Sequence, residues 1–173
     1  MGITSIPISV NVSVAQLKYE APSDNLLDII RQYEIENNLL ELEITESMLL
    51  DDEVSSIQFL NKVRAMGVSI ALDDFGTGYS SLNYLCSLPI NTLKIDRSFL
   101  CDIEFDKRPL AMLNAIMTMA NALSLTTVSE GIETSEQLAL VKGIGCSSAQ
   151  GFYLSVPVSV DQATKMLSAE AII

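Results

Sequence analysis

Histidine is absent from this 173-residue chain, and cysteine occurs only three times. Without histidine, the chain has neither a Ser-His nor a Cys-His nucleophilic pair, and it lacks the imidazole ligands of most zinc sites. Cys86, Cys101 and Cys146 are widely spaced, so they predict neither a disulfide framework nor a metal knuckle. We therefore expect reduced thiols and a cytoplasmic location.

Basic side chains are also scarce. Ten lysines and arginines stand against 22 aspartates and glutamates, which gives a net charge of −12. Binding to nucleic acid relies on lysine and arginine, so we expect no DNA partner. An anionic ligand would need metal ions to reverse the local field. Apolar runs are short, and none approaches the roughly 18 residues of a spanning helix, so we expect no membrane segment.

What the chain does contain is a large apolar fraction. Hydrophobic residues make up 49% of the sequence and the mean hydropathy is +0.33. We expect one domain over residues 1–173, with strands buried on both faces as in parallel sheets. Apolar, β-branched-rich runs recur in PISVNV (7–12), LLELEIT (39–45), GVSIALD (67–73), TLKID (92–96), LTTVSE (125–130) and QGFYLS (150–155).

Helical segments separate these runs. SDNLLDIIRQYEIENN opens with the possible caps Ser23 and Asp24, and DDEVSSIQFLNKVRAMG stops at Gly67. Two more helices are expected over about 108–123 and in EQLALVKGIG. This alternation predicts an α/β fold with a parallel sheet. A closed eight-stranded barrel takes roughly 250 residues, so six units in 173 residues predict a barrel with two units missing.

The stretch IALDDFGTGYSSL ends a buried strand with two adjacent carboxylates, Asp73 and Asp74. On its own, this pair is compatible with an ordinary strand-ending turn. Other polar side chains nevertheless fall at or near the ends of the predicted strands, and Gln150 opens the last one. They are Asn11, Glu43, Asp73, Lys94 and Glu130. In α/β sheets and barrels, that edge is where ligands bind.

The acidic members of this set favour a hard cation. Glu43, Asp73 and Asp74, with the amide of Asn11, offer oxygen ligands that suit Mg²⁺ or Mn²⁺. Two metals that share a bridging carboxylate would explain why two aspartates are adjacent, and such a pair clamps a phosphodiester. Asn11 can also be an ordinary buried amide, so this interpretation depends on the group as a whole.

Three further residues complete the chemistry. Lys94 can hold a phosphate oxygen or position the attacking water, and Glu130 and Glu133 can supply a further ligand and orient that water. The set predicts metal-assisted hydrolysis of a phosphate ester. Lys94 also has two other interpretations: it can pair with Asp96, or it can form a Schiff base on a barrel strand.

The glutamates of ELEITES, Glu43 and Glu46, have a structural alternative as well. They can simply begin the following helix, where acidic side chains favour the helix dipole.

The motifs VNVS, ELEITES, ALDDFGTGYSSL, LKIDRSF, SEGIE and QGFYLSVP closely resemble the EAL domain, the cyclic di-GMP phosphodiesterase family of bacteria. The match runs from about residue 8 to about residue 158, in the family's own order and spacing. The resemblance implies a TIM-like (βα)8 barrel of EAL type, incomplete here with about six βα units. It also implies two Mg²⁺ or Mn²⁺ ions and cleavage of cyclic di-GMP to pGpG.

The resemblance also implies roles for individual residues. Asn11, Glu43, Asp73 and Asp74 correspond to metal ligands, with Asp73 as the bridging carboxylate. Glu46 corresponds to the glutamate that braces the loop after Asp74.

Around the substrate, the resemblance assigns a second group of residues. Lys94 corresponds to the lysine that positions water and phosphate, Glu130 to the catalytic-site glutamate and Glu133 to its neighbour in substrate binding. Gln150 corresponds to the amide that bonds the attacking water, and Pro157 to a proline that lines a guanine pocket.

The chain departs from the family pattern in one respect that matters. The family's Glu-Ala-Leu segment precedes VNVS, and its metal-binding glutamate and following arginine are not in this sequence. We therefore expect an EAL-domain protein related to the phosphodiesterases but impaired or inactive as this chain alone. The alternative is a non-catalytic cyclic di-GMP receptor or a protein-interaction module. A smaller departure is Ser129, where the family usually has alanine.

Two missing units would leave the edges of PISVNV and QGFYLS bare. Bare strand edges invite pairing with another chain, so we expect a homo-oligomer that covers them. If the chain belongs to a longer protein, sensor or GGDEF-type modules are expected upstream.

Overall fold

The computed structural model describes residues 6–13, 20–32, 36, 39–46, 48, 53–76, 82–101 and 107–168. Within them lies a parallel sheet of six strands in chain order, β1 to β6. The strands are β1 (Ile8–Asn11), β2 (Leu40–Thr45), β3 (Ser69–Phe75), β4 (Thr92–Ile95), β5 (Thr126–Ser129) and β6 (Ser148–Ala149). The helices are α2 (Glu20–Gln32), α4 (Glu53–Ala65), α5 (Leu82–Ser87), η2 (Arg97–Leu100), α6 (Lys107–Ala122), α7 (Ser135–Gly143) and α8 (Val160–Ser168).

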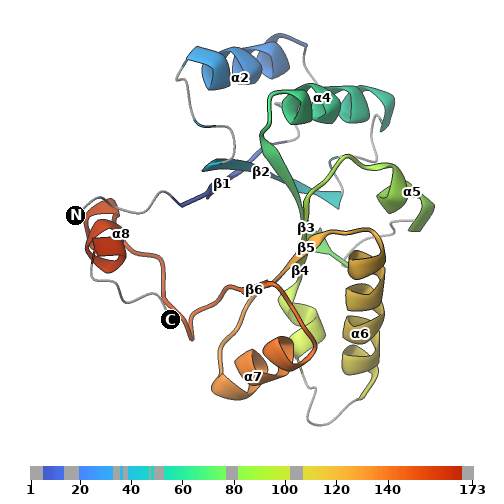
Figure 1. The fold of residues 1–173 in the computed structure, drawn as a ribbon, viewed down its shortest axis with the longest axis vertical. Coiled ribbons are helices and arrows are strands. Elements are labelled where there is room, and N and C mark those ends of the chain that lie inside the picture. The colour runs from blue at the N-terminus through green and yellow to red at the C-terminus, as the bar shows by residue number, and fades with distance from the viewer. Residues whose placement is uncertain are drawn as a thin grey trace.

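The sheet curls into part of a barrel. Figure 1 shows the strands following an arc, with α2, α4, α5, α6 and α7 around its outer side. The arc stays open between β1 and β6, and α8 lies on that open side. The prediction of an incomplete parallel α/β barrel with six strands is confirmed. None of the helices in the described part of the chain has the length and apolar character needed to cross a bilayer.

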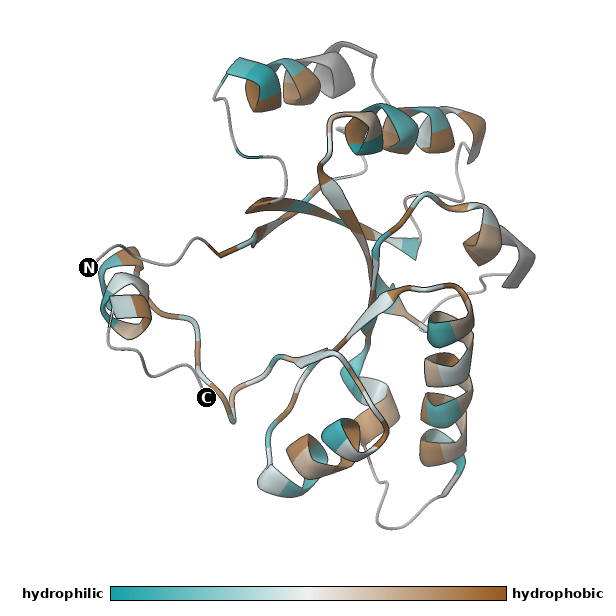
Figure 2. Ribbon diagram, viewed as in Figure 1, coloured by the Kyte–Doolittle hydropathy of each residue, from teal (hydrophilic) through white to brown (hydrophobic). Residues whose placement is uncertain are grey.

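The two faces of the sheet differ because side chains alternate along each strand. The outer face packs against the helices and is apolar. In Figure 2, the strands and the surrounding helices both carry brown, hydrophobic segments. Its central side chains are at most 1% exposed, and burying each one contributes about 1.5–3 kcal/mol. They include Leu42, Ile44, Ile70, Leu72, Leu93 and Ile95. The concave face carries the polar residues of the same strands.

The predicted sixth strand over 150–155 is wrong, because β6 covers only Ser148–Ala149 and a turn follows it. The reason is a close backbone approach at Gly151, where an added Cβ would collide with the backbone of Ile132. Ile132 N–H donates to the Gln150 carbonyl at 3.0 Å, and Tyr153 N–H donates to the Ile132 carbonyl at 3.0 Å. Gln150 therefore directly follows β6 instead of opening it.

The helix predictions are mostly confirmed. α4 ends just before Gly67, which has a φ of 82°, a conformation that glycine adopts without strain. α2, in contrast, begins at Glu20, so Ser23 and Asp24 lie within the helix and the prediction that they cap it is wrong. Pro22 falls in the first turn of α2, where the N–H that proline lacks has no helical partner in any case.

Candidate active site

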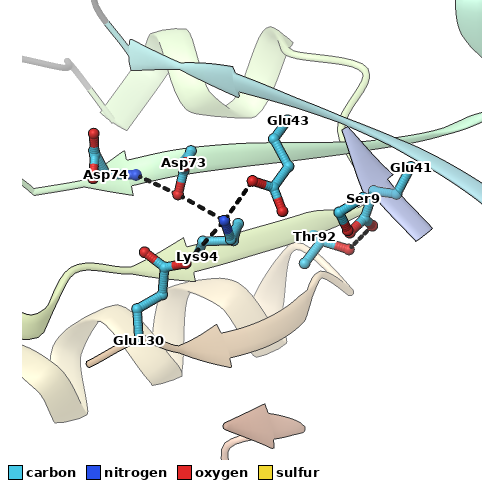
Figure 3. Close-up of polar contacts among 8 residues, drawn as sticks. All are labelled: Ser9, Glu41, Glu43, Asp73, Asp74, Thr92, Lys94 and Glu130. Carbon is cyan, nitrogen blue, oxygen red and sulfur yellow. Dashed lines mark hydrogen bonds and ion pairs between the residues drawn. The ribbon is translucent and has the colours of Figure 1, made fainter. Parts of the chain in front are cut away.

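Lys94 of β4 lies at the centre of the site. Its Nζ is 2.7 Å from Glu43 Oε2 of β2 and 3.0 Å from Asp73 Oδ1 of β3. It is also 2.8 Å from Oε1 of Glu130, the residue after β5. Figure 3 shows the three carboxylates converging on the ammonium from the concave face of the sheet. β2 and β4 are not neighbours in the sheet, so their side chains meet here because the sheet curls around β3.

The carboxylates hold Lys94 as a cation. The side chain is almost fully buried, and burial disfavours its charge. Hydrogen bonds to Glu130, Glu43 and Asp73 outweigh that penalty and raise the pKa of Lys94 above its ordinary value. A Schiff base needs a neutral amine, so this environment disfavours the aldolase-type interpretation. The alternative pairing of Lys94 with Asp96 is wrong, because Asp96 caps η2 by accepting a bond from Ser98 N–H at 2.9 Å.

A kink in β3 brings Asp74 to the same site. The register between β3 and β4 breaks between Leu72 and Phe75, and Asp74 has a φ of 54°. Aspartate tolerates this left-handed conformation better than most residues. The Asp74 N–H donates to Asp73 Oδ1 at 3.0 Å. Successive strand side chains normally point to opposite faces, but here both aspartates serve one site.

The oxygens that this kink assembles suit a divalent cation. Carboxylate oxygens of Asp73, Asp74 and Glu130 lie within 4.8 Å of one another. Burial, followed by the charge of Asp73, raises the pKa of Asp74. Burial also raises the pKa of Glu130, although Lys94 opposes that rise. These close carboxylates repel one another, and a divalent cation would relieve that repulsion. A donor set made only of oxygens fits the preferences of Mg²⁺ and Mn²⁺.

The remaining predicted ligand and loop residues lie close by. Asn11 ends β1 in register with Glu43, and its side chain is exposed, so the alternative of a buried amide is wrong. Glu46 directly follows β2 and is 4% exposed. The loop that Glu46 is predicted to brace includes residues 77–81, which lie outside the described residues.

A cavity next to Glu130 brings together three of the predicted site residues. It measures about 230 Å³, and Glu130, Glu133 and Gln150 line it. Asp96 and Arg97 line it too, and sequence reasoning missed them as site residues although both belong to the motif LKIDRSF. Pro157, the other residue predicted to contact substrate, is exposed and does not line this cavity.

Ser129 lies on the opposite face of β5 from the site. It is fully buried, and among the described residues its hydroxyl oxygen has no hydrogen-bond partner. The departure from alanine at this position therefore lies on the face that packs against the helices.

The fold and the site together define a class of protein: an incomplete parallel α/β barrel with an acidic, lysine-centred site at the carboxyl ends of its strands. Comparison with known families then gives the particular family. The chain belongs to the EAL domain family, whose model matches residues 2–157.

Relatives and solved structures agree with this assignment. The bifunctional diguanylate cyclase/cyclic di-GMP phosphodiesterase MucR of Pseudomonas aeruginosa is 40% identical over 155 residues, which cover 90% of this chain and 23% of MucR. The structure of the MucR phosphodiesterase in complex with c-di-GMP has a TM-score of 0.85 at 39% identity, covering 91% of this chain and 64% of that one. The EAL domain of Mycobacterium smegmatis DcpA has a TM-score of 0.89 at 35% identity, covering 97% and 75%.

Proposed function

We propose that this chain carries an EAL-type site for the metal-dependent hydrolysis of cyclic di-GMP to pGpG, and that turnover is impaired in this chain alone. The observation that carries the proposal is the contact of Lys94 with Glu43, Asp73 and Glu130, with Asp74 beside them. The MucR relative is named as a cyclic di-GMP phosphodiesterase, and its solved structure holds that dinucleotide. The shared family and fold support the same substrate here.

The metal-binding residues would be Asn11, Glu43, Asp73, Asp74 and Glu130, and we propose Mg²⁺ or Mn²⁺ as the ions. Asp73, Asp74 and Glu130 already place oxygens within 4.8 Å of one another, which supports their sharing an ion. When bound, such ions polarise a phosphodiester and lower the pKa of water.

The chain's own side chains would position the substrate and the attacking water. The fixed charge of Lys94 attracts a phosphate oxygen and positions the attacking water. Glu130, held by Lys94 beside Asp73 and Asp74, would help to orient that water. As the water oxygen bonds to phosphorus and its proton passes to solvent, the bond from phosphorus to the 3′ oxygen breaks, the 3′ oxygen takes up a proton from solvent, and the linear product keeps both nucleotides. Gln150 orients the water, while Glu133 and Pro157 contact the dinucleotide.

Impaired turnover is proposed because the site is open on the β1 side. Asn11 at the end of β1 is exposed, and among the described residues no strand lies beyond it. The competing function is a non-catalytic receptor or an interaction module. One feature is compatible with it: Lys94 compensates the charges of Glu43, Asp73 and Glu130, so the site needs no bound metal ion for electrostatic stability.

A homo-oligomer would cover the open side. The side chains of β1 are all exposed, including Ile8 at 62% and Val10 at 45%. Exposed apolar strands at a sheet edge favour association, so we propose a second copy as the partner. Any sensor or GGDEF-type module would lie elsewhere in a longer protein. A cytoplasmic location is proposed because Cys86, Cys101 and Cys146 are all free thiols.

The test is conversion of cyclic di-GMP to pGpG by the purified chain with Mn²⁺, beside Asp73→Ala. Asp161→Ala is the matched control, because Asp161 is an exposed aspartate of α8, outside the site. Product from the wild type and the control, but not from Asp73→Ala, supports the enzyme. Dinucleotide binding without product supports the receptor, and failure to bind contradicts both.

A further inference from the structure

A second polar contact lies one layer below the active site. Glu41 of β2 accepts hydrogen bonds on both carboxylate oxygens: Thr92 Oγ1 of β4 donates to Oε2 at 2.7 Å, and Ser9 Oγ of β1 donates to Oε1 at 3.0 Å. Figure 3 shows Glu41 between these two hydroxyls, on the same face of the sheet as Lys94. One side chain therefore connects three strands, and β4 is not a neighbour of β2.

This contact repeats the geometry of the site above it. Glu41 and Glu43 are two residues apart on β2, as Thr92 and Lys94 are on β4, so each pair shares a face. β2 and β4 are thus linked twice across β3, by Glu41 with Thr92 and by Glu43 with Lys94. Two residues along a strand correspond to about 6.6 Å, so the lower link lies close enough to control the spacing in the upper one.

β3 leaves room for both links. Ala71 is in register with Glu43 on one side and with Thr92 on the other, and it is fully buried. It precedes Asp73 by two residues and therefore shares its concave face. A methyl side chain at this position lets long side chains of β2 reach β4 over β3.

We propose that Glu41 is a positioning residue for the active site. By joining Ser9 and Thr92, it sets the curvature of β1, β2 and β4, and this curvature determines the distances among Asn11, Glu43 and Lys94. A carboxylate can do this because it accepts two bonds in different directions at once. If Glu41 accepted a bond from only one of the two hydroxyls, it would link only two strands. The inference rests on the proposed function in that Asn11 and Glu43 serve as metal ligands.

The test removes the link without touching the site. Thr92→Val keeps the shape of the side chain but removes the hydroxyl, and Thr92→Ser keeps the hydroxyl. Mn²⁺ affinity is measured by the loss of the free-ion signal in electron paramagnetic resonance. Removing an outer partner that orients metal ligands predicts affinity lower by roughly tenfold in Thr92→Val, with near wild-type affinity in Thr92→Ser. Equal affinity in all three proteins would overturn the inference.

A second measurement needs no metal. Thr92→Val and Glu43→Gln are combined in a double-mutant cycle, and unfolding in urea is followed in metal-free buffer. Non-additive stabilities show that the lower link and the site are coupled, whereas additive stabilities contradict the inference. If the wild type fails to bind Mn²⁺, the proposed function fails, and the cycle still decides whether Glu41 and Thr92 position Glu43.

Discussion

Replacing Lys94 by methionine tests the electrostatics of the site most directly. Methionine fills a similar volume but leaves Glu43, Asp73 and Glu130 without the ammonium that lies 2.7–3.0 Å from each. Removing one partner of a buried ion pair costs about 3–5 kcal/mol, because the remaining charge stays buried without compensation. With an m-value of about 2 kcal/mol/M in urea, the unfolding midpoint should fall by roughly 1.5–2.5 M.

The loss of folding stability in Lys94→Met should depend on pH. The pKa of Glu130 is already raised by burial, and removing Lys94 eliminates the main influence that lowers it. A carboxyl group whose folded pKa lies above its unfolded value contributes stability below the unfolded pKa, about 4.3 for glutamate, and loses it as pH rises through the folded pKa. Lys94 itself, with a raised pKa, contributes fully below about 10.4. The difference in the free energy of unfolding between Lys94→Met and the wild type should therefore be large near pH 7.5 and small near pH 4.

The assay is urea unfolding followed by circular dichroism at both pH values. Lys142→Met serves as the control, because Lys142 is an exposed lysine of α7 outside the site. Added Mn²⁺ should recover part of the stability of Lys94→Met, since a cation that binds only the folded state stabilises it. Equal midpoints for Lys94→Met and the control at pH 7.5 would refute the reasoning.

Three further predictions concern other parts of the molecule. Gly131 has a φ of 67°, so Gly131→Ala should cost at least about 1–3 kcal/mol in thermal unfolding, whereas Gly143→Ala, with open space around the added methyl, should cost nothing. Ser129→Ala removes a buried hydroxyl that has no partner among the described residues, and it should stabilise the chain by about 1 kcal/mol; a lower melting temperature would contradict this. Val10→Lys on β1 should shift the chain toward monomer in size-exclusion chromatography with light scattering, and Val54→Lys on α4 should not, although Val54 is also exposed. A wild type that is already monomeric argues against the oligomer.

Much of the site could be predicted because the strands stand out in the sequence as apolar, β-branched-rich runs. Glu43, Asp73 and Lys94 fall at or near the ends of such runs, and parallel strands in chain order bring those ends to one edge. What the runs could not show is how far the sheet curls. The contact between Glu43 and Lys94 across β3 depends on that curvature, and so does the contact between Glu41 and Thr92.

Local departures from regular strand geometry also could not be predicted from the sequence pattern. Asp74 reaches the same site as Asp73 with a positive φ, which breaks the usual alternation of side chains along a strand. The sixth strand was misplaced because Gly151 permits a backbone approach to Ile132 that no apolar run reveals.

Lys94 also has a consequence for how the protein depends on its surroundings. Small domains whose ligands repel one another until an ion arrives cannot fold without that ion. Here the chain supplies its own counter-charge, so we expect the folded population to be indifferent to metal shortage. A metal ion that enters the site then competes with the Lys94 ammonium for the same carboxylate oxygens. Occupancy of the site by metal depends on that competition. For the proposed phosphodiesterase, metal scarcity would then lower turnover and leave the folded fraction unchanged.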